Sequence, residues 1–119
     1  MGKLKKRYVG KIGYCDNADL GINKPKGHYV YIRKYYNNGT CDVNTITSLE
    51  DNKGNFNLSK IEHVKKGNTY CIPKYDSNFT RWSGVNKTPI KGVPISKIQN
   101  IGNKSFKKRH RFYIGKFLK

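Results

Sequence analysis

Apolar and polar residues alternate along much of this chain with the two-residue period that β-strands show. The alternation is strongest over residues 28–36, where Val30 and Ile32 fall on one predicted face and tyrosines occupy the positions beside them. The Asn-Gly pair that ends at Gly39 predicts a hairpin turn of type I′, because both residue types tolerate positive φ angles. We expect residues 40–48 to return as the partner strand.

The pattern within residues 40–48 is irregular. The apolar positions include Val43 and Ile46, so the alternation slips by one residue between them. The slip predicts either a β-bulge at Asn44 or Thr45, which would re-aim side chains near a site, or a strand buried on both faces. The sequence leaves both interpretations open.

Shorter segments predict the remaining regular elements. Strands are expected over residues 8–15, 69–74 and 88–93. Residues 58–65 fit either a short helix or the first arm of a second hairpin. An isoleucine at every third position of residues 95–101 predicts one helical turn packed on the core.

Two long segments lack any period. Residues 16–27 are rich in Asp, Asn, Gly and Pro, and residues 75–87 contain the single tryptophan, so both are predicted to be loops. A loop of such length in a small domain is more often functional than idle. The chain also has a basic start, residues 1–7, and a basic tail, residues 104–119, whose end is strand-like.

The sum of these elements predicts the class of fold. Many short strands, tight turns and almost no helix favour a mostly β domain that is a small closed or semi-closed barrel with one or two helical turns. SH3-like and OB-like barrels are the two candidates. We expect one domain over residues 1–119.

Net charge then narrows the set of partners. The chain has 25 Lys and Arg against 7 Asp and Glu, which gives a formal charge of +18. Such an excess repels itself in a folded protein, so a polyanion explains it better than stability does. We expect nucleic acid, since an anionic membrane surface would call for a basic amphipathic helix. The alternative is that biased composition produces a solvated lysine surface.

Several classes of protein are excluded by what the sequence lacks. It has no apolar run of the length of a membrane span and no signal peptide, so we expect a cytoplasmic protein. Three cysteines without Cys-x-x-Cys spacing predict reduced thiols and no zinc ribbon. The histidines are far apart in the sequence and the carboxylates are few, so we expect neither a metal nor a cofactor.

Basic and hydroxyl side chains are therefore the groups available for catalysis. They suit RNA cleavage by attack of the 2′-hydroxyl on the neighbouring phosphate, which needs a base, an acid and cations but no metal. His28 titrates near neutrality and Lys26 can hold a phosphate. Thr47 and Ser48 can donate hydrogen bonds to a phosphate oxygen. For each residue taken singly, a structural role is the simpler interpretation.

A second group of residues is suited to binding nucleic acid. The aromatic and arginine side chains of residues 75–87 have the composition that stacks unpaired bases, although Phe79 and Trp82 could instead plug one end of a barrel. The basic cluster of the tail would add steering and salt-dependent affinity. The predicted contacts are Lys24, Arg33, Arg81, Trp82, Lys107, Lys108, Arg109 and Arg111.

The order of four segments resembles one family. Residues 10–16 read Gly-Lys-Ile-Gly-Tyr-Cys-Asp, and after a loop residues 26–32 open with a basic residue. Residues 41–48 end in Ile-Thr-Ser, and residues 89–101 begin Pro-Ile-Lys-Gly-Val-Pro. This arrangement is similar to the MazF/PemK family of toxin endoribonucleases.

The resemblance implies an SH3-like barrel, usually a homodimer, that cleaves single-stranded RNA without a metal and is neutralised by an antitoxin protein. Thr47 matches the catalytic threonine of that family. The position of the catalytic arginine falls on Lys26 or His28, depending on a one-residue choice of register. The alternative is a related non-catalytic barrel that binds nucleic acid, encoded by a mobile element.

Overall fold

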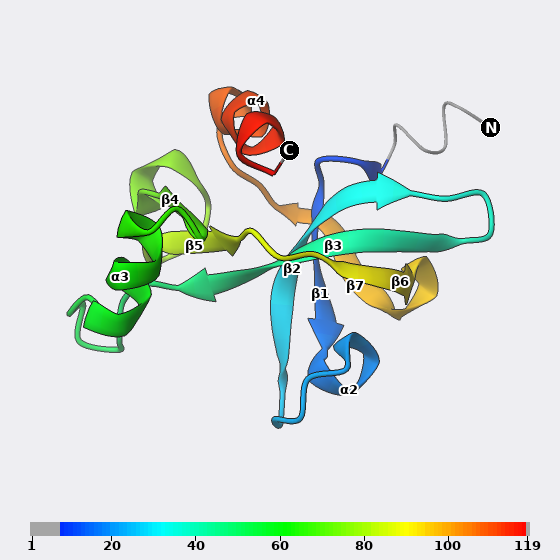
Figure 1. The fold of residues 1–119 in the computed structure, drawn as a ribbon, viewed down its shortest axis with the longest axis horizontal. Helices are drawn as coiled ribbons and strands as arrows, with labels where there is room; N and C mark the ends of the chain where they lie inside the picture. The colour runs from blue at the N-terminus through cyan, green and yellow to red at the C-terminus, as the bar shows by residue number, and fades with distance from the viewer. Residues whose placement is uncertain (1–7, 119) are drawn as a thin grey trace.

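The computed structural model describes residues 8–118, so the basic start predicted at residues 1–7 lies outside the described residues. The strands are β1 (Ile12–Asp16), β2 (Gly27–Tyr35), β3 (Thr40–Ser48), β4 (Thr69–Ile72), β5 (Ser83–Asn86), β6 (Ile90–Pro94) and β7 (Ile98–Lys104). The helices are α2 (Asn17–Leu20), α3 (Leu58–Lys65) and α4 (Lys108–Phe117), with 3-10 turns η1 (Lys74–Asp76) and η2 (Ile95–Lys97). All strand pairs are antiparallel (Figure 1).

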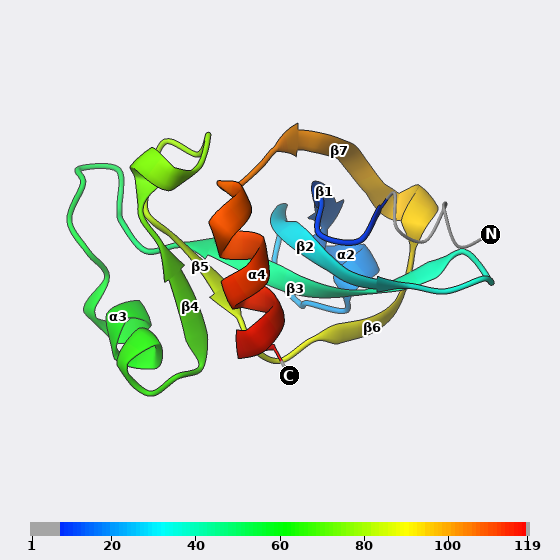
Figure 2. The ribbon, with the colours of Figure 1, turned by 90° about the horizontal axis from the view of Figure 1, so that it is seen from above.

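The mostly β class predicted from the alternation is confirmed, but the expectation of only one or two helical turns is wrong, because α3 and α4 are helices of eight and ten residues. One sheet has the order β4-β5-β3-β2-β1-β7, and β6 pairs with the first half of β3. Five of its strands, in the order β6-β3-β2-β1-β7, curl around an apolar cluster (Figure 2). Within the described chain β6 and β7 are joined through η2 and not by strand pairing, so the sheet does not close into a barrel.

Two apolar clusters cover the two faces of the central strands. The first lies between the sheet and α4 and includes Tyr31, Ile46 and Ile114. The second lies inside the curled strands and includes Val30 and Ile32. Because neighbouring residues of β2 point to opposite faces, each of its faces contributes to a different cluster. Helices α4 and α2 therefore lie on opposite sides of the central strands (Figure 1).

The hairpin between β2 and β3 is confirmed, but its predicted turn type is wrong. The N–H of Gly39 donates to the carbonyl of Tyr36 at 3.1 Å, and Gly39 alone in this turn has a left-handed backbone, with φ +83°. A type I′ turn would need positive φ at two residues. The side-chain Oδ1 of Asn38 accepts hydrogen bonds from the N–H and the hydroxyl of Thr40, so the asparagine stabilises the turn through its side chain.

The irregular pattern of β3 comes from burial on both faces, and the predicted bulge at Asn44 or Thr45 is wrong. Residues 41–46 are all buried, and the pairing with β2 is regular across both positions. The bulge lies in β2 instead. Ile32 pairs with Val43 and Lys34 pairs with Asp42, which leaves Arg33 as the extra residue.

The predicted loops contain short elements that tertiary contacts stabilise. The segment predicted as a loop over residues 75–87 holds β5, whose one large apolar residue, Val85, gives no alternation. Its backbone pairs with β3 on one side and β4 on the other, and this pairing defines the strand. Residues 16–27 contain the single turn of α2. The predicted first strand begins late, at Ile12.

Other boundaries follow from periods that the sequence left ambiguous. Residues 58–65 form α3, so the helix is the correct alternative. In residues 95–101 only η2 is helical, and Ile98 already belongs to β7. The strand-like end predicted for residues 104–119 is wrong: α4 forms there, and His110, Ile114 and Leu118 are buried at four-residue spacing, which is a helical period.

Candidate nucleic-acid interface

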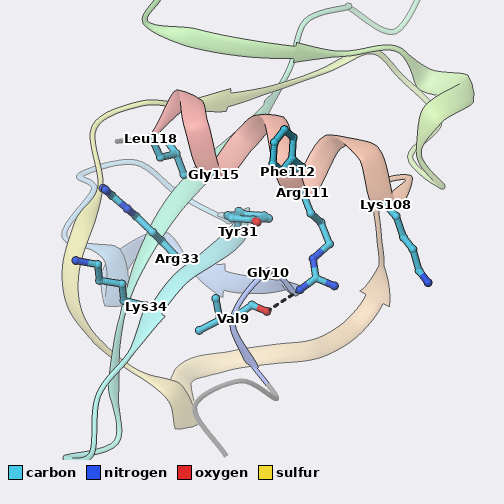
Figure 3. A pocket seen from close by; sticks show the side chains of 10 residues that line it. All are labelled: Val9, Gly10, Tyr31, Arg33, Lys34, Lys108, Arg111, Phe112, Gly115 and Leu118. Atoms are coloured by element: carbon cyan, nitrogen blue, oxygen red, sulfur yellow. Dashed lines mark hydrogen bonds between the residues drawn. The ribbon is translucent and has the colours of Figure 1, made fainter. Parts of the chain in front are cut away.

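A large cavity lies between α4 and β2 (Figure 3). Its volume is about 740 Å³. Arg33 and Lys34 come from one side, Lys108 and Arg111 from the other, and the ring of Tyr31 lies between the two sides. The cavity is thus a space of small-ligand size with cations on opposite walls.

The β-bulge of β2 explains why two consecutive residues line this cavity. In a regular strand Arg33 and Lys34 would point to opposite faces. Because Arg33 is the extra residue between two paired positions, both side chains reach the same cavity. The alternation pattern assigns only Arg33 to the face of Tyr31, so Lys34 could not be found from the sequence.

The opposite wall is one face of α4. Lys108, Arg111, Gly115 and Leu118 recur at spacings of three to four residues, so they lie along one side of the helix. Phe112 occupies the same wall and is 62% exposed. The wall therefore combines cations at the start of the helix with apolar surface towards its end.

A second cavity of about 270 Å³ adjoins the first. The two share Lys108 and Arg111, and the second adds Lys11 and Lys104. We call the combined surface the basic trough; its cations are Lys11, Arg33, Lys34, Lys104, Lys108 and Arg111. No Asp or Glu of the described chain is among the residues that line either cavity.

Arg111 is held where the two cavities meet. Its Nη2 donates to the carbonyl of Val9 at 3.3 Å. Gly10 has a left-handed backbone, with φ +86°, which favours glycine, and a Cβ there would displace the same guanidinium from a distance of 2.5 Å. Burial raises the pKa of Tyr31, and the nearby Arg111 charge offsets part of that effect. The phenol thus stays protonated on the floor of the trough.

A buried carboxylate fixes α4 to the sheet. Asp76 accepts from His110 Nε2 at 2.8 Å and from Arg109 Nη2 at 2.8 Å, and Lys107 Nζ lies 3.3 Å from its other oxygen. These hydrogen bonds, above all those from His110 and Arg109, lower the pKa of Asp76 from 3.8 to about 2. His110 Nδ1 is 2.9 Å from the hydroxyl of Tyr70, which extends the network to β4.

This network divides the basic tail into two functional sets. Lys107 and Arg109, predicted as nucleic-acid contacts, form ion pairs with Asp76 and do not line the trough. Lys108 and Arg111 lie on the side of α4 away from Asp76, and both line the trough. Lys11 was missed because most of its neighbours in the trough are distant in the sequence. Lys104 was missed because charge alone does not separate it from the other lysines of the tail.

The remaining predicted contacts lie elsewhere. Lys24 is exposed on the loop between α2 and β2. Helix α2 and this loop lie on the side of the sheet away from α4 (Figure 1). Arg81 donates to Asn52 at 2.8 Å. Trp82 packs edge-on against the exposed rings of Phe56 and Tyr75, with centroids 5.5 Å and 5.8 Å away. The three rings form an aromatic surface that is separate from the basic trough.

Phe79 belongs to the core and not to that surface. Its ring lies 5.0 Å from the ring of Tyr29 and 5.9 Å from that of Phe106. It packs against the cluster beneath α4. Phe79 therefore has a structural role beneath α4, outside the curled strands, and does not plug one end of a barrel.

The predicted catalytic residues lie around the ends of β2 and β3. Thr47, Ser48 and Arg81 line one cavity of about 200 Å³. Lys26 and His28 are not among its lining residues. The pairing of β2 with β3 ends at the pair Tyr29–Ile46. Beyond this pair the start of β2 and the end of β3 diverge (Figure 1). The Ser48 hydroxyl donates to the carbonyl of Glu50 at 2.8 Å, as a turn cap does.

His28 holds the loop before β2. Its Nδ1 lies 2.6 Å from the carbonyl oxygen of Asn17, whose amide nitrogen donates to the carbonyls of Lys24 and Pro25. That arrangement assigns the proton to Nδ1 and leaves Nε2 able to accept one. Burial, followed by the charges of Lys60 and Lys24, lowers the pKa of His28. The imidazole is thus neutral at neutral pH.

Lys60 of α3 is hydrogen-bonded to the end of β3. Its Nζ donates to the carbonyl of Ser48 at 2.8 Å, and it is close enough to His28 to lower that pKa. Lys26 carries a left-handed backbone, with φ +71°, and its carbonyl accepts from the N–H of Asn17 at 2.8 Å. A base and a cation therefore border the gap where the strands diverge.

The described residues contain neither a candidate metal site nor a membrane-spanning helix. Residues 8–118 contain no cluster of three His, Cys, Asp or Glu side chains that could hold a metal ion. No helix in the same range has the length and apolarity to cross a bilayer. No model of a known protein family and no curated protein sequence matches the chain.

Proposed function

We propose that this protein binds nucleic acid through the basic trough. The observation that carries the proposal is the gathering of six cationic side chains around two adjoining cavities that no carboxylate lines. Phosphate groups are the ligands that such a surface attracts most strongly, and Arg33 and Arg111 can each bind one with two hydrogen bonds. The net charge of +18 adds long-range attraction.

Charge-matched variants test this role. We expect Lys34→Gln/Lys108→Gln to weaken binding of a single-stranded RNA oligonucleotide roughly tenfold, because two phosphate contacts are lost. The control is Lys53→Gln/Lys91→Gln, which removes the same charge from exposed positions outside the trough. Fluorescence anisotropy measures both. Equal losses in the two variants would contradict a localised interface and favour a generally basic surface.

A metal-independent endoribonuclease is the second candidate function. Its support is the neutral His28, whose Nε2 can accept a proton, beside the Lys60 cation at the end of β3. A base of this kind could activate a 2′-hydroxyl while cations stabilise the charged phosphate. Thr47 and Ser48 would then contact the phosphate, as the resemblance to MazF/PemK toxins suggests, and an antitoxin and a homodimer would follow from the same resemblance.

Incubation with single-stranded RNA in EDTA tests this activity. The enzyme hypothesis predicts products with a 2′,3′-cyclic phosphate, lost in Thr47→Ala and His28→Gln. The glutamine amide can still donate to Asn17, so His28→Gln removes the base while keeping the loop contact. Intact RNA with the wild-type chain, together with tight binding, would leave nucleic-acid binding as the function.

The finer description of the fold belongs to the same proposal. An SH3-like barrel is supported by the five curled strands β6-β3-β2-β1-β7 around one apolar cluster and by the 3-10 turn η2 between β6 and β7. An OB-like barrel is the alternative. An experimental structure compared with both barrel types decides between them.

A further inference from the structure

Gly115 is an unexpected residue in the wall of the basic trough. It lies inside α4, where glycine is less favourable than alanine. Its backbone has no left-handed φ, and a Cβ built on it would meet no atom within 4 Å. Neither conformation nor packing requires glycine here. Its effect is to leave the cavity of about 740 Å³ open beside Phe112.

The first turn of α4 is also unfavourable for an isolated helix. It carries Lys108, Arg109 and Arg111 and no acidic residue, at the end where the helix dipole is already positive. Asp76 neutralises part of this charge through Arg109. Lys108 and Arg111 face the trough, and an anion there would relieve the remaining repulsion.

The arrangement of apolar and charged groups specifies the kind of anion. Phe112 is 62% exposed on the wall, with the Lys116 ammonium 4.6 Å from its ring centroid. Arg33 and Arg111 stand on opposite sides of the cavity (Figure 3). Such a site can hold a flat aromatic group against the ring while charges on each side bind two separate phosphates.

We infer that the cavity between α4 and β2 takes the base of one unpaired nucleotide, with the phosphates on its two sides held by Arg33 and Arg111. The inference rests on the proposed nucleic-acid binding and adds the class of ligand: a single strand with accessible bases. In a duplex the bases are paired and stacked inside the helix, so they cannot enter the cavity. A duplex therefore meets only the rim cations of the trough.

Two ligands of equal length and charge test the inference on the wild-type protein. One is a single-stranded RNA oligonucleotide, and the other is its abasic counterpart with the same sugar-phosphate chain. We expect the base-bearing strand to bind about tenfold more tightly, because stacking of one base on an aromatic side chain strengthens binding by a factor between about 5 and 150. Equal affinities would overturn the inference while leaving the proposed nucleic-acid binding intact.

Filling the cavity supplies the matched protein variant. Gly115→Leu keeps every cation and favours the helix, and we expect it to abolish the preference for the base-bearing strand while duplex RNA binds as before. Ser59→Leu, which places a leucine at an exposed position of α3 outside the trough, is the control that retains the preference. A Gly115→Leu protein that is folded by circular dichroism and keeps the preference would overturn the inference. Failure of the wild-type chain to bind any of the three ligands would instead refute the proposed function itself.

Discussion

Lys26 adopts a backbone conformation that lysine disfavours. Its φ of +71° lies in the left-handed region, where a side chain costs about 1–2 kcal/mol. We expect Lys26→Gly to raise the free energy of unfolding by about 0.5–1 kcal/mol, because strain relief exceeds the entropic cost of glycine. Urea denaturation measures the change. Lys24→Gly, at a position without positive φ, is the control and should be slightly destabilising.

His28 gives the protein a pH dependence with a defined sign. Its pKa in the folded protein is below the ordinary 6.5, so folding favours the neutral ring. The stabilisation is complete above 6.5 and is lost as the pH falls through the lower folded value. We expect the urea midpoint of the wild type to fall between about pH 7.5 and pH 5.5 more than that of His28→Gln. Parallel midpoints in the two proteins would contradict a depressed pKa.

Single residues of the trough were only partly predictable. Arg33, Lys108 and Arg111 were expected to contact nucleic acid from charge and position, and all three line the trough. Lys34 was not predicted as a residue of the trough, because a β-bulge at Arg33 interrupts the strict alternation of faces. No local sequence pattern indicates that bulge. Lys104 escaped because its proximity to the helix depends on how β7 leads into α4. Charge predicts attraction, and tertiary structure selects the residues.

At the scale of elements, the attachment of α4 depends on one carboxylate. We expect Asp76→Asn to lower the melting temperature by several degrees, because His110 loses its ionised partner and Arg109 and Lys107 lose their ion pairs. RNA binding should weaken as well, since α4 forms a wall of the trough. Thermal unfolding by circular dichroism measures the first effect. Glu62→Gln, which removes an exposed carboxylate from α3, is the control.

The same carboxylate predicts behaviour in acid. The pKa of Asp76 is lowered to about 2, so its contribution to stability is present above the ordinary value of 3.8 and is lost as the pH falls towards 2. We expect the melting temperature of the wild type to converge on that of Asp76→Asn across this range. A difference between the two proteins that stays constant down to about pH 2 would contradict the network.

Helix α4 also contains a simple test of its own composition. Gly115→Ala should raise the free energy of unfolding by about 0.5–1 kcal/mol, because alanine is the better helix former and its methyl group meets open space. Chemical denaturation is the measurement. A destabilised variant would mean that the wall of the cavity is packed more tightly than the structure indicates.

Elements with a strong local period were predictable, and those fixed by distant partners were not. The hairpin of β2 and β3 follows from alternation and an Asn-Gly turn. In contrast, β5 has no pattern of its own and exists because it pairs with strands on both sides. The prediction of a strand within residues 104–119 was wrong, because glycine and aromatic residues make the four-residue burial period of α4 hard to recognise in the sequence.

For the whole molecule, the number of cations in the trough sets the salt dependence of binding. Six phosphate contacts to a single strand predict a slope of about −4 in a plot of log affinity against log salt concentration. Lys34→Gln/Lys108→Gln should reduce the steepness by about 1.4, whereas Lys53→Gln/Lys91→Gln should change it little. Anisotropy titrations at several salt concentrations measure the slope. A steepness of about 13, which contacts through all 18 excess charges would give, is not expected, because most lysines lie outside the trough.

The β-bulge at Arg33 also bears on how the length of this chain can vary. Deleting one residue from a central strand normally moves every later side chain to the opposite face. Deleting Arg33 would instead bring Ile32 directly before Lys34, and their pairs with Val43 and Asp42 would form an unbroken ladder. The hairpin and both apolar clusters would keep their register, and only one cation would be lost. The middle of β2 is thus a place where a one-residue gap in the sequence changes the function before it changes the fold.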